Sequence, residues 1–396
     1  MIYLSADYLL PITSHSIKGG VLAVHENGLI NGIFKPDEAP VPESEIQKLR
    51  GILCPGFINT HCHLELSWLL DKISKDAGLD GFIGQLEQEK KKPVDADAII
   101  SSIEKAEQEM LLSGIVAVGD ISNTIASFQT KKQGKLLYHT FVEVFGSDIE
   151  RAGEFFDDAR QLFSHALANG LIASVVPHSP YSVSKELLKL VGTFAYKTGG
   201  LLSIHHQENE DENRYLESGD GPVAERIRRF GIKVPDVNSP GCRPLPAVAH
   251  YLPWTNKLIL VHNTVSKEDD IAYAMKHFNN LWWCICAGSN LYISGILPDI
   301  NALRRAGAKI TLGTDSLASN KHLSVLDEMK TISKYYPEVE LEELFSWATI
   351  NGAEALGFSD KLGSFEAGKK PGIILIEQEA GENVVLAQDS KVKRIL

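Results

Sequence analysis

The feature that most constrains this chain is a regular alternation of short apolar runs with segments of helical length, beginning at residue 57. Eight of the runs have the length and the β-branched content of buried strands. They occupy residues 57–61, 115–120, 137–144, 172–178, 201–205, 258–262, 282–286 and 309–315. Amphipathic segments such as residues 99–112 and 184–191 lie between them. Because strands that alternate with helices form parallel sheets, eight such units predict a (β/α)8 barrel.

The two ends of the chain contain short β-type runs separated by turns. Residues 26–28, Glu-Asn-Gly, lie between two apolar runs and are typical of a hairpin turn. Residues 373–376 and 384–386 are apolar runs of the same kind near the C-terminus. We therefore predict an α/β fold, a TIM-like barrel with a small β-sandwich formed from both termini. The expected boundaries are residues 57–355 for the barrel, and 1–56 with 356–396 for the sandwich.

The composition excludes several classes of partner. The chain has 39 Lys and Arg against 51 Asp and Glu, a net charge of −12, and no basic stripe for a nucleic acid. The N-terminus has no basic segment before an apolar run, and no apolar stretch approaches the length of a membrane span. The five cysteines are few and scattered, which suits a reducing compartment. We expect a cytoplasmic protein with a small-molecule substrate, and neither a nucleic-acid nor a membrane partner.

Polar side chains stand where the predicted strands end. His61 and His63 close the first strand, and Asp315 ends the eighth. Further histidines follow the fourth, fifth and sixth strands, namely His178, His205 and His262. The carboxyl ends of barrel strands meet at one face, where the active sites of such barrels lie. The sequence therefore predicts an active site at this face.

Four of these residues have the chemistry of a metal site. His61 and His63 are two apart on a strand, so they point to one side at roughly 7 Å spacing. His205 is the expected third nitrogen ligand and Asp315 the oxygen ligand. Such a ligand set holds one divalent metal and leaves room for a water molecule on it. Zn²⁺ is expected in the first place, with Fe as an open alternative. The metal lowers the pKa of the bound water toward about 7. The alternative for the first pair is two structural histidines.

Glu208 and His262 are the candidates for proton transfer, together with Asp315. Glu208 is three residues beyond His205, close enough to move protons without binding the metal. Its alternative role is as a solvated member of an acidic run. His262 could orient water or polarise the substrate, or be a histidine bonded within the barrel. By strand alternation, His206 and Cys62 are expected to point away from the metal.

Substrate contacts are expected from residues that follow the strands. The candidates are His178, Glu65, Trp68 and Ser319, with Ser289, Asn290 and Asn320 also near the pocket. Trp68 has an alternative role in packing. No GxGxxG, phosphate-binding loop or GxSxG motif is present in the sequence, so nucleotide-phosphate transfer and serine hydrolysis are unsupported.

The strand-end motifs resemble those of the amidohydrolase superfamily. Residues 55–63 resemble its first-strand signature, and His205-His206-Gln207-Glu208 looks like its HxxE on strand five. Residues 260–263 and 312–320 are similar to the motifs on strands six and eight. Residues 286–290 resemble a CPxSN motif whose Pro is replaced, and residues 363–369 a GxxxxGK turn. The resemblance runs from end to end and includes the split β-sandwich.

Within that superfamily the chain resembles the single-metal aminohydrolases, since the fourth strand end has no lysine for a bridging carbamate. Those enzymes act on S-adenosylhomocysteine, adenosine-like nucleosides, guanine and triazines. The resemblance implies a hydrolase of C–N bonds other than peptide bonds, a cyclic amidine deaminase in which metal-bound hydroxide adds to a ring carbon and ammonia leaves. Residues 63–67 resemble the corresponding segment of aminodeoxyfutalosine deaminases, which act on a 6-aminopurine nucleoside-like menaquinone precursor.

Deamination of a 6-aminopurine nucleoside-like substrate is therefore the leading hypothesis. The alternatives are a guanine deaminase, a triazine-type chlorohydrolase or amidohydrolase with the same site, and a non-catalytic scaffold. The substrate itself, Zn versus Fe, and the oligomeric state stay open, with a homodimer as the assembly to test. The role of residues 209–246, longer than a βα connection needs, is also open.

Overall fold

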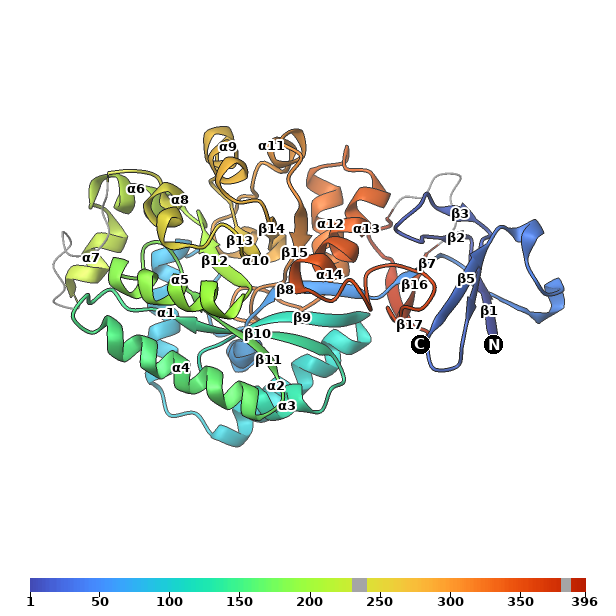
Figure 1. Ribbon diagram of the computed structural model, residues 1–396, viewed down its shortest axis with the longest axis horizontal. Helices are drawn as coiled ribbons and strands as arrows, with labels where there is room; N and C mark the ends of the chain where they lie inside the picture. Colours follow the sequence, from blue (N-terminus) through green and yellow to red (C-terminus); the bar gives the residue numbers. More distant parts are fainter. Residues whose placement is uncertain (230–240, 379–385) are drawn as a thin grey trace.

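The computed structural model describes residues 1–229, 241–378 and 386–396 (Figure 1). Its centre consists of two four-stranded parallel sheets, ordered β8-β9-β10-β11 and β12-β13-β14-β15. The strands are β8 (Phe57–Cys62), β9 (Ile115–Ser122), β10 (Leu137–Val144), β11 (Ile172–Pro177), β12 (Leu202–His206), β13 (Leu258–His262), β14 (Leu281–Ile285) and β15 (Ile310–Leu312). All eight predicted strands are present, although the last is shorter than expected.

The two sheets approach each other at both edges. Between β8 and β15, Cys62 forms a parallel bridge with Asp315, and the backbone N–H groups of Thr314 and Asp315 both donate to the carbonyl of His61. Between β11 and β12, the His205 N–H donates to the carbonyl of His178 at 2.9 Å. Strand β15 ends early because these two donors converge on one carbonyl, so the regular ladder cannot continue.

Helices lie between successive strands, and some of them have a side-chain cap at the N-terminus. The two predicted helices are α2 and α5; Asp95 caps α2, Ser184 caps α5, and Gly199 ends α5 in the left-handed region. The long helices α4 and α5 pack through edge-to-face contacts of Phe194 with two rings of α4.

The helices are α1 (Gly78–Lys91), α2 (Ala96–Leu112), α3 (Phe128–Lys132), α4 (Ala152–Ala168), α5 (Lys185–Thr198), α6 (Glu210–Ser218), α7 (Pro222–Arg229), α8 (Pro244–Val248), α9 (Glu268–His277), α10 (Ala287–Ile293), α11 (Ile300–Arg305), α12 (Val325–Tyr335), α13 (Leu341–Ala348) and α14 (Ile350–Leu356). The 3-10 helices of the described residues are η1 (Pro36–Glu38), η2 (Glu43–Glu45), η3 (Leu64–Leu69) and η5 (Ala249–Tyr251).

The segment after β12, which the sequence left without a role, contains α6, α7 and α8 within its described part; residues 230–240 lie outside the described residues. In the described part of the chain, no helix combines the length and apolarity that crossing a membrane requires.

Strands from both ends of the chain share one sheet. The two terminal sheets have the orders β5-β4-β1-β6 and β17-β16-β7-β2-β3, and in the second β16 pairs antiparallel with β7. Their strands are β1 (Ile2–Ser5), β2 (Tyr8–Leu9), β3 (Ile17–Lys18), β4 (Val21–Val24), β5 (Ile30–Phe34), β6 (Ile46–Lys48), β7 (Ile52–Pro55), β16 (Ile373–Glu377) and β17 (Lys391–Arg394). Figure 1 shows both termini beside these strands, at one end of the molecule.

An apolar cluster connects the two terminal sheets. It includes Leu4 and Leu22 from the first sheet, and Leu53 and Leu375 from the second. The predicted hairpin is confirmed, because β4 and β5 are antiparallel across the turn at residues 26–28. The predicted run at residues 384–386 lies almost entirely outside the described residues, and the closing strand is β17.

Candidate active site

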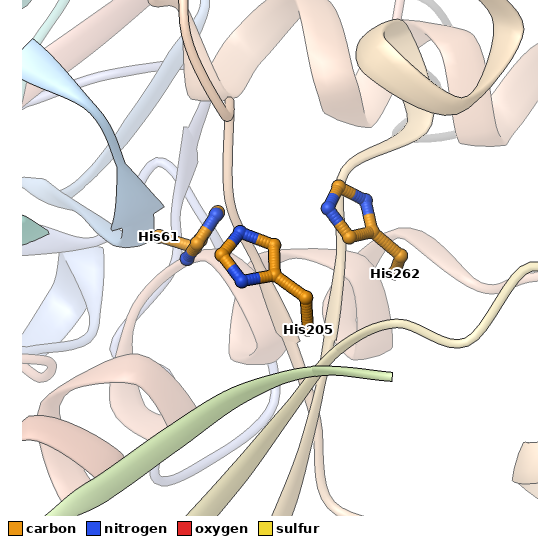
Figure 2. Close-up of side chains that lie close together, drawn as sticks. All are labelled: His61, His205 and His262. Atoms are coloured by element: carbon orange, nitrogen blue, oxygen red, sulfur yellow. The ribbon is translucent and has the colours of Figure 1, made fainter. Parts of the chain in front are cut away.

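Three histidine rings converge at the carboxyl ends of the central strands. The Nε2 atom of His63 lies 3.2 Å from the Nε2 atoms of both His61 and His205. Asp315 Oδ1 is 3.5 Å from His61 Nε2 and 3.4 Å from His63 Nε2. All four residues are buried, and their polar atoms gather from β8, β12 and the turn after β15. Figure 2 shows the rings of His61 and His205 side by side, with His262 next to them.

The hydrogen bonds of the outer ring nitrogens indicate the state of this cluster. His205 Nδ1 lies 2.9 Å from the carbonyl oxygen of His178, so Nδ1 carries the hydrogen and Nε2 presents a lone pair to the cluster. Burial lowers the pKa of both His63 and His205 well below the ordinary value, which keeps these rings neutral. Neutral imidazole is the form that binds metal ions. Converging lone pairs beside a carboxylate oxygen fit a divalent cation.

Asp315 uses its two carboxylate oxygens differently. Oδ1 faces His61 and His63, whereas Oδ2 accepts hydrogen bonds from the hydroxyls of Ser289, at 2.7 Å, and Ser319, at 2.5 Å. Burial opposes the ionisation of Asp315, but the hydrogen bond from His61 helps to hold its pKa well below the ordinary range. The carboxylate is therefore ionised, oriented by two hydroxyls, and free to bind a cation through Oδ1.

Glu208 lies on the other side of the cluster, close to His262. Its Oε1 is 3.8 Å from His262 Nε2, and the Nδ1 of that ring lies 2.9 Å from the side-chain oxygen of Asn290. Glu208 is 7% exposed, which excludes the solvated role considered for it. Burial raises the pKa of Glu208, which favours its protonated form relative to an exposed carboxyl. The site thus combines a cluster of potential metal ligands with a buried acid beside it.

The family follows from a sequence comparison. The profile of the amidohydrolase family matches residues 52–395, almost the whole chain. The chain belongs to the amidohydrolase family. All the strand-end residues described above lie within the matched part of this amidohydrolase.

Relatives of this amidohydrolase include an adenosine deaminase of Helicobacter pylori (strain ATCC 700392 / 26695). It is 28% identical over 334 residues, which are 81% of this chain and 77% of the relative. A 5'-deoxyadenosine deaminase of Methanobrevibacter smithii is 29% identical over 397 residues, 93% of this chain and 82% of the relative. The crystal structure of Helicobacter pylori aminofutalosine deaminase in complex with methylthio-coformycin shares the fold, with a TM-score of 0.80 at 23% identity. That match covers 96% of this chain and 94% of the other.

The four residues expected to contact substrate have different surroundings in this amidohydrolase. The His178 ring centroid is 4.7 Å from that of His205, at the edge of the cluster. Glu65 accepts hydrogen bonds from the backbone of residues 123 and 124 and from the Thr124 hydroxyl. Trp68 is half-buried in an apolar cluster that contains Leu69 and Ala318. Ser319 donates to Asp315, so it has a partner within the protein.

The residues expected to point away from the cluster do so. His206 is buried, with its Nδ1 3.0 Å from Asn263 Oδ1 and its ring against Trp283. It belongs to no group of potential metal ligands among the described residues. Cys62 is likewise buried and outside those groups, and burial raises the pKa of its thiol well above the ordinary value.

Sequence reasoning missed Glu143, at the end of β10. Its Oε1 lies 3.4 Å from His205 Nδ1, and its Oε2 accepts a hydrogen bond from Asn123 at 3.1 Å. Burial raises the pKa of Glu143 to about 7. The signal was available in principle, because a carboxylate near the end of a run of buried-strand residues is unusual.

A surface pocket begins directly after Glu208 in the chain. Asn209 and Glu210 line it, together with Asp76 from the segment after β8 and Ile293 and Ser294 from the end of α10. Its volume is about 280 Å³. Asn209 and Ile293 lie close in the chain to Glu208 and Asn290, whereas none of the residues that line the pocket belongs to the histidine and aspartate cluster.

Proposed function

We propose that this amidohydrolase is a metal-dependent hydrolytic deaminase of a 6-aminopurine nucleoside-like substrate. The observation that carries the proposal is the convergence of three histidine Nε2 atoms and Asp315 Oδ1 next to the buried acid Glu208. His61, His63, His205 and Asp315 would hold one divalent metal ion, and three imidazoles with one carboxylate suit Zn²⁺. When bound, such an ion lowers the pKa of a coordinated water and supplies hydroxide near neutral pH.

Glu208 would move the protons of the reaction. Hydrolytic deamination adds water to the carbon that carries the amino group, protonates the adjacent ring nitrogen and releases ammonia. A protonated Glu208 can donate to the ring nitrogen, recover a proton from the adding water, and pass it to the departing amino group. Its buried position next to His262 supports this role, because burial raises the pKa of Glu208 above that of an exposed carboxyl and so makes it a better proton donor.

His262 and Asp315 would orient the adding water. The Nδ1 of His262 is paired with Asn290, so its Nε2 presents a lone pair to the site and can accept a water hydrogen. Asp315 Oδ1 faces the same space and can accept the other hydrogen. His178 is the residue best placed to contact the base, and Trp68 is proposed to border the substrate near the segment after β8.

Two sets of facts support the purine nucleoside as substrate class. Both reported relatives are named for deamination of adenosine or 5'-deoxyadenosine, and they match most of this chain. The chain also shares its fold with an aminofutalosine deaminase that binds methylthio-coformycin. The part of the substrate beyond the base would extend toward the pocket that Asn209 and Glu210 line.

We further propose that the two central sheets form one closed eight-stranded barrel over residues 57–355. The hydrogen bonds at the β8–β15 and β11–β12 edges support this closure. Residues 1–56 and 356–396 would form one β-sandwich around the shared apolar cluster. Free thiols of all five cysteines suit a cytoplasmic location.

A substrate panel with purified protein tests the proposed function. Ammonia release is measured with adenosine, 5'-deoxyadenosine, methylthioadenosine, S-adenosylhomocysteine, aminodeoxyfutalosine and guanine, with the metal content determined on the same sample. We expect turnover of at least one 6-aminopurine nucleoside by protein that contains about one metal ion per chain. If guanine alone were turned over, the proposed substrate class would be wrong. If no compound of the panel were turned over, deamination of these purines would be rejected.

A further inference from the structure

A fully buried ion pair lies behind the strand that carries His61 and His63. Lys131, on the short helix α3, places its Nζ 2.5 Å from Asp120 Oδ2, and both side chains are 0% exposed. The ammonium group also donates to the hydroxyls of Ser122, at 2.8 Å, and Thr140, at 3.3 Å. Lys131 therefore has three oxygen partners for its three hydrogens. Burying two charges is costly, so the pair needs a reason beyond stability.

The other oxygen of Asp120 makes a contact with the end of the first barrel strand. Asp120 Oδ1 accepts a hydrogen bond from the backbone N–H of Leu64 at 2.7 Å. Leu64 directly follows His63 and is the first residue of η3. Lys131 thus pairs with one carboxylate oxygen of Asp120. The other oxygen accepts a hydrogen bond from the peptide group that directly follows His63.

On its β9 side, the backbone ladder alone does not fix this part of the strand. The ladder between β8 and β9 is regular at Asn59 and Val118, then shifts register before Cys62 pairs with Asp120. The irregular stretch contains His61, and His63 comes directly after it. The Asp120 side chain therefore accepts the Leu64 N–H hydrogen bond in place of a backbone carbonyl of the ladder. This happens next to His61 and His63, whose rings must be oriented.

We propose that Asp120 is a positioning residue for His63, and that Lys131 keeps the Asp120 carboxylate turned toward Leu64. This inference rests on the proposed metal site, in which His63 is a ligand. Groups that orient metal ligands from behind typically contribute about 10–100-fold in metal affinity. The pair should therefore affect how tightly the protein holds its metal, independently of how stably the chain folds.

The test uses two double variants that both remove the buried charges. Asp120→Leu/Lys131→Met has no acceptor for the Leu64 N–H, whereas Asp120→Asn/Lys131→Met keeps a carbonyl oxygen at that place. Replacing a buried pair with apolar residues often preserves stability. Zn²⁺ affinity is measured by competition with a chromophoric chelator, and folding by urea denaturation of the metal-free protein. We expect the Leu/Met variant to lose about 10–100-fold in Zn²⁺ affinity and the Asn/Met variant to stay within a few-fold of wild type.

The control removes an ion pair elsewhere. Arg304 on α11 and Glu343 on α13 form a partly exposed pair at 2.7 Å, and Arg304→Met/Glu343→Leu should leave Zn²⁺ affinity unchanged. Wild-type affinity in the Leu/Met variant, or equal losses in both Asp120 variants, would overturn the inference. If the Leu/Met variant does not fold, Asp120→Ala/Lys131→Met is measured in its place under the same criteria. A wild-type chain that binds no Zn²⁺ would instead contradict the proposed metal site, and the inference with it.

Discussion

His63 and His206 offer a matched pair of substitutions for the metal site. His63 has its Nε2 in the cluster, whereas His206 is equally buried but bonded to Asn263. We expect His63→Ala to lower the metal content well below one ion per chain and to abolish activity, because the remaining ligands leave an open shell. His206→Ala should keep its metal. Elemental analysis of both variants checks this prediction. If His206→Ala lost its metal while His63→Ala kept it, His63 would not be a ligand.

The role of Glu208 can be separated from metal binding by one substitution. Glu208→Gln keeps the size of the side chain but cannot carry the transferred proton. Full metal occupancy and near-normal binding of a substrate analogue are expected, with kcat lowered by roughly 10²-fold or more. Steady-state kinetics on an active substrate of the panel supplies the measurement. A change in KM alone would indicate that Glu208 only binds substrate, and a normal kcat would transfer the proton role to His262 or Asp315.

Strand periodicity predicted which histidines face the site, although it missed Glu143. The alternation rule separated His205 from His206 and put both His61 and His63 on one side, and the structure has them so. It could not predict that the hydroxyl of Ser319 turns to Asp315, or that the backbone of residues 123 and 124 engages Glu65. Such pairings depend on loop conformation, which side-chain spacing along one strand does not contain.

At the scale of elements, three of the strands that carry the site, β12, β13 and β15, end in or lead into left-handed backbone. Gln207 after β12 has φ 48°, His262 and Asn263 at the end of β13 have φ 73° and 57°, and Asp315 after β15 has φ 57°. Non-glycine residues seldom adopt this region, and they cluster at functional sites that the surrounding structure holds in place. The sequence gives no sign of these turns, because no glycine marks them. The alternating pattern predicts the strands but not the angle at which each leaves the sheet.

The first turn of α6 supplies the support for Glu208. Glu212 is fully buried and its Oε2 accepts a hydrogen bond from the Glu208 N–H at 3.2 Å. Burial raises the pKa of Glu212 to about 8, so the group is neutral at pH 7 and its amide analogue is a close substitute.

We expect Glu212→Ala to lower kcat by up to about 10²-fold with metal content unchanged, because Glu208 loses its backbone anchor. Glu212→Gln, which keeps an acceptor oxygen, should restore most of the rate. Kinetics and elemental analysis of both variants check the prediction. Equal rates in the Ala and Gln variants would show that Glu212 does not orient Glu208.

At the scale of the whole molecule, the sequence predicted the central architecture better than the ends. Buried strands of a parallel sheet are nearly continuous apolar runs, so all eight were recognisable from residue type. The last strand, β17, consists of Lys391–Arg394, whose alternating burial has one face exposed. Its charged residues pair with β16 through the backbone, which composition does not reveal. Pairing between residues more than 300 positions apart was inferred from the similar character of the two ends and from the family resemblance, and the β7–β16 ladder confirms this pairing.

The stability of the whole chain should depend on the protonation of Glu328 on α12. This residue is 2% exposed, and it accepts hydrogen bonds from the Gly288 N–H at 2.8 Å and from the Asn320 side chain at 2.9 Å. These two bonds connect α12 to the start of α10 and to the turn after β15. Burial raises the pKa of Glu328 from its ordinary value of 4.5 to about 7, even though these hydrogen bonds favour the ionised form. A folded-state pKa above the unfolded value means that the native protein retains a proton which the unfolded chain has already released. The contribution is therefore fully present below about pH 4.5 and is lost as the pH rises toward about 7.

Replacing this carboxyl with an amide isolates its contribution. One proton of difference corresponds to about 1.4 kcal/mol of unfolding free energy per pH unit, an upper bound for a single group. Glu328→Gln cannot ionise, so the unfolding free energy of wild type relative to this variant should fall between about pH 5 and pH 7 and stay level above that range. Urea denaturation at several pH values, with metal-free protein to exclude ligand protonation, measures the difference. Buried carboxyls such as Glu212 titrate in both proteins, so their contributions cancel in the difference of the unfolding free energies. Parallel curves of unfolding free energy against pH for wild type and Glu328→Gln would show that Glu328 ionises at its ordinary pKa in the folded chain.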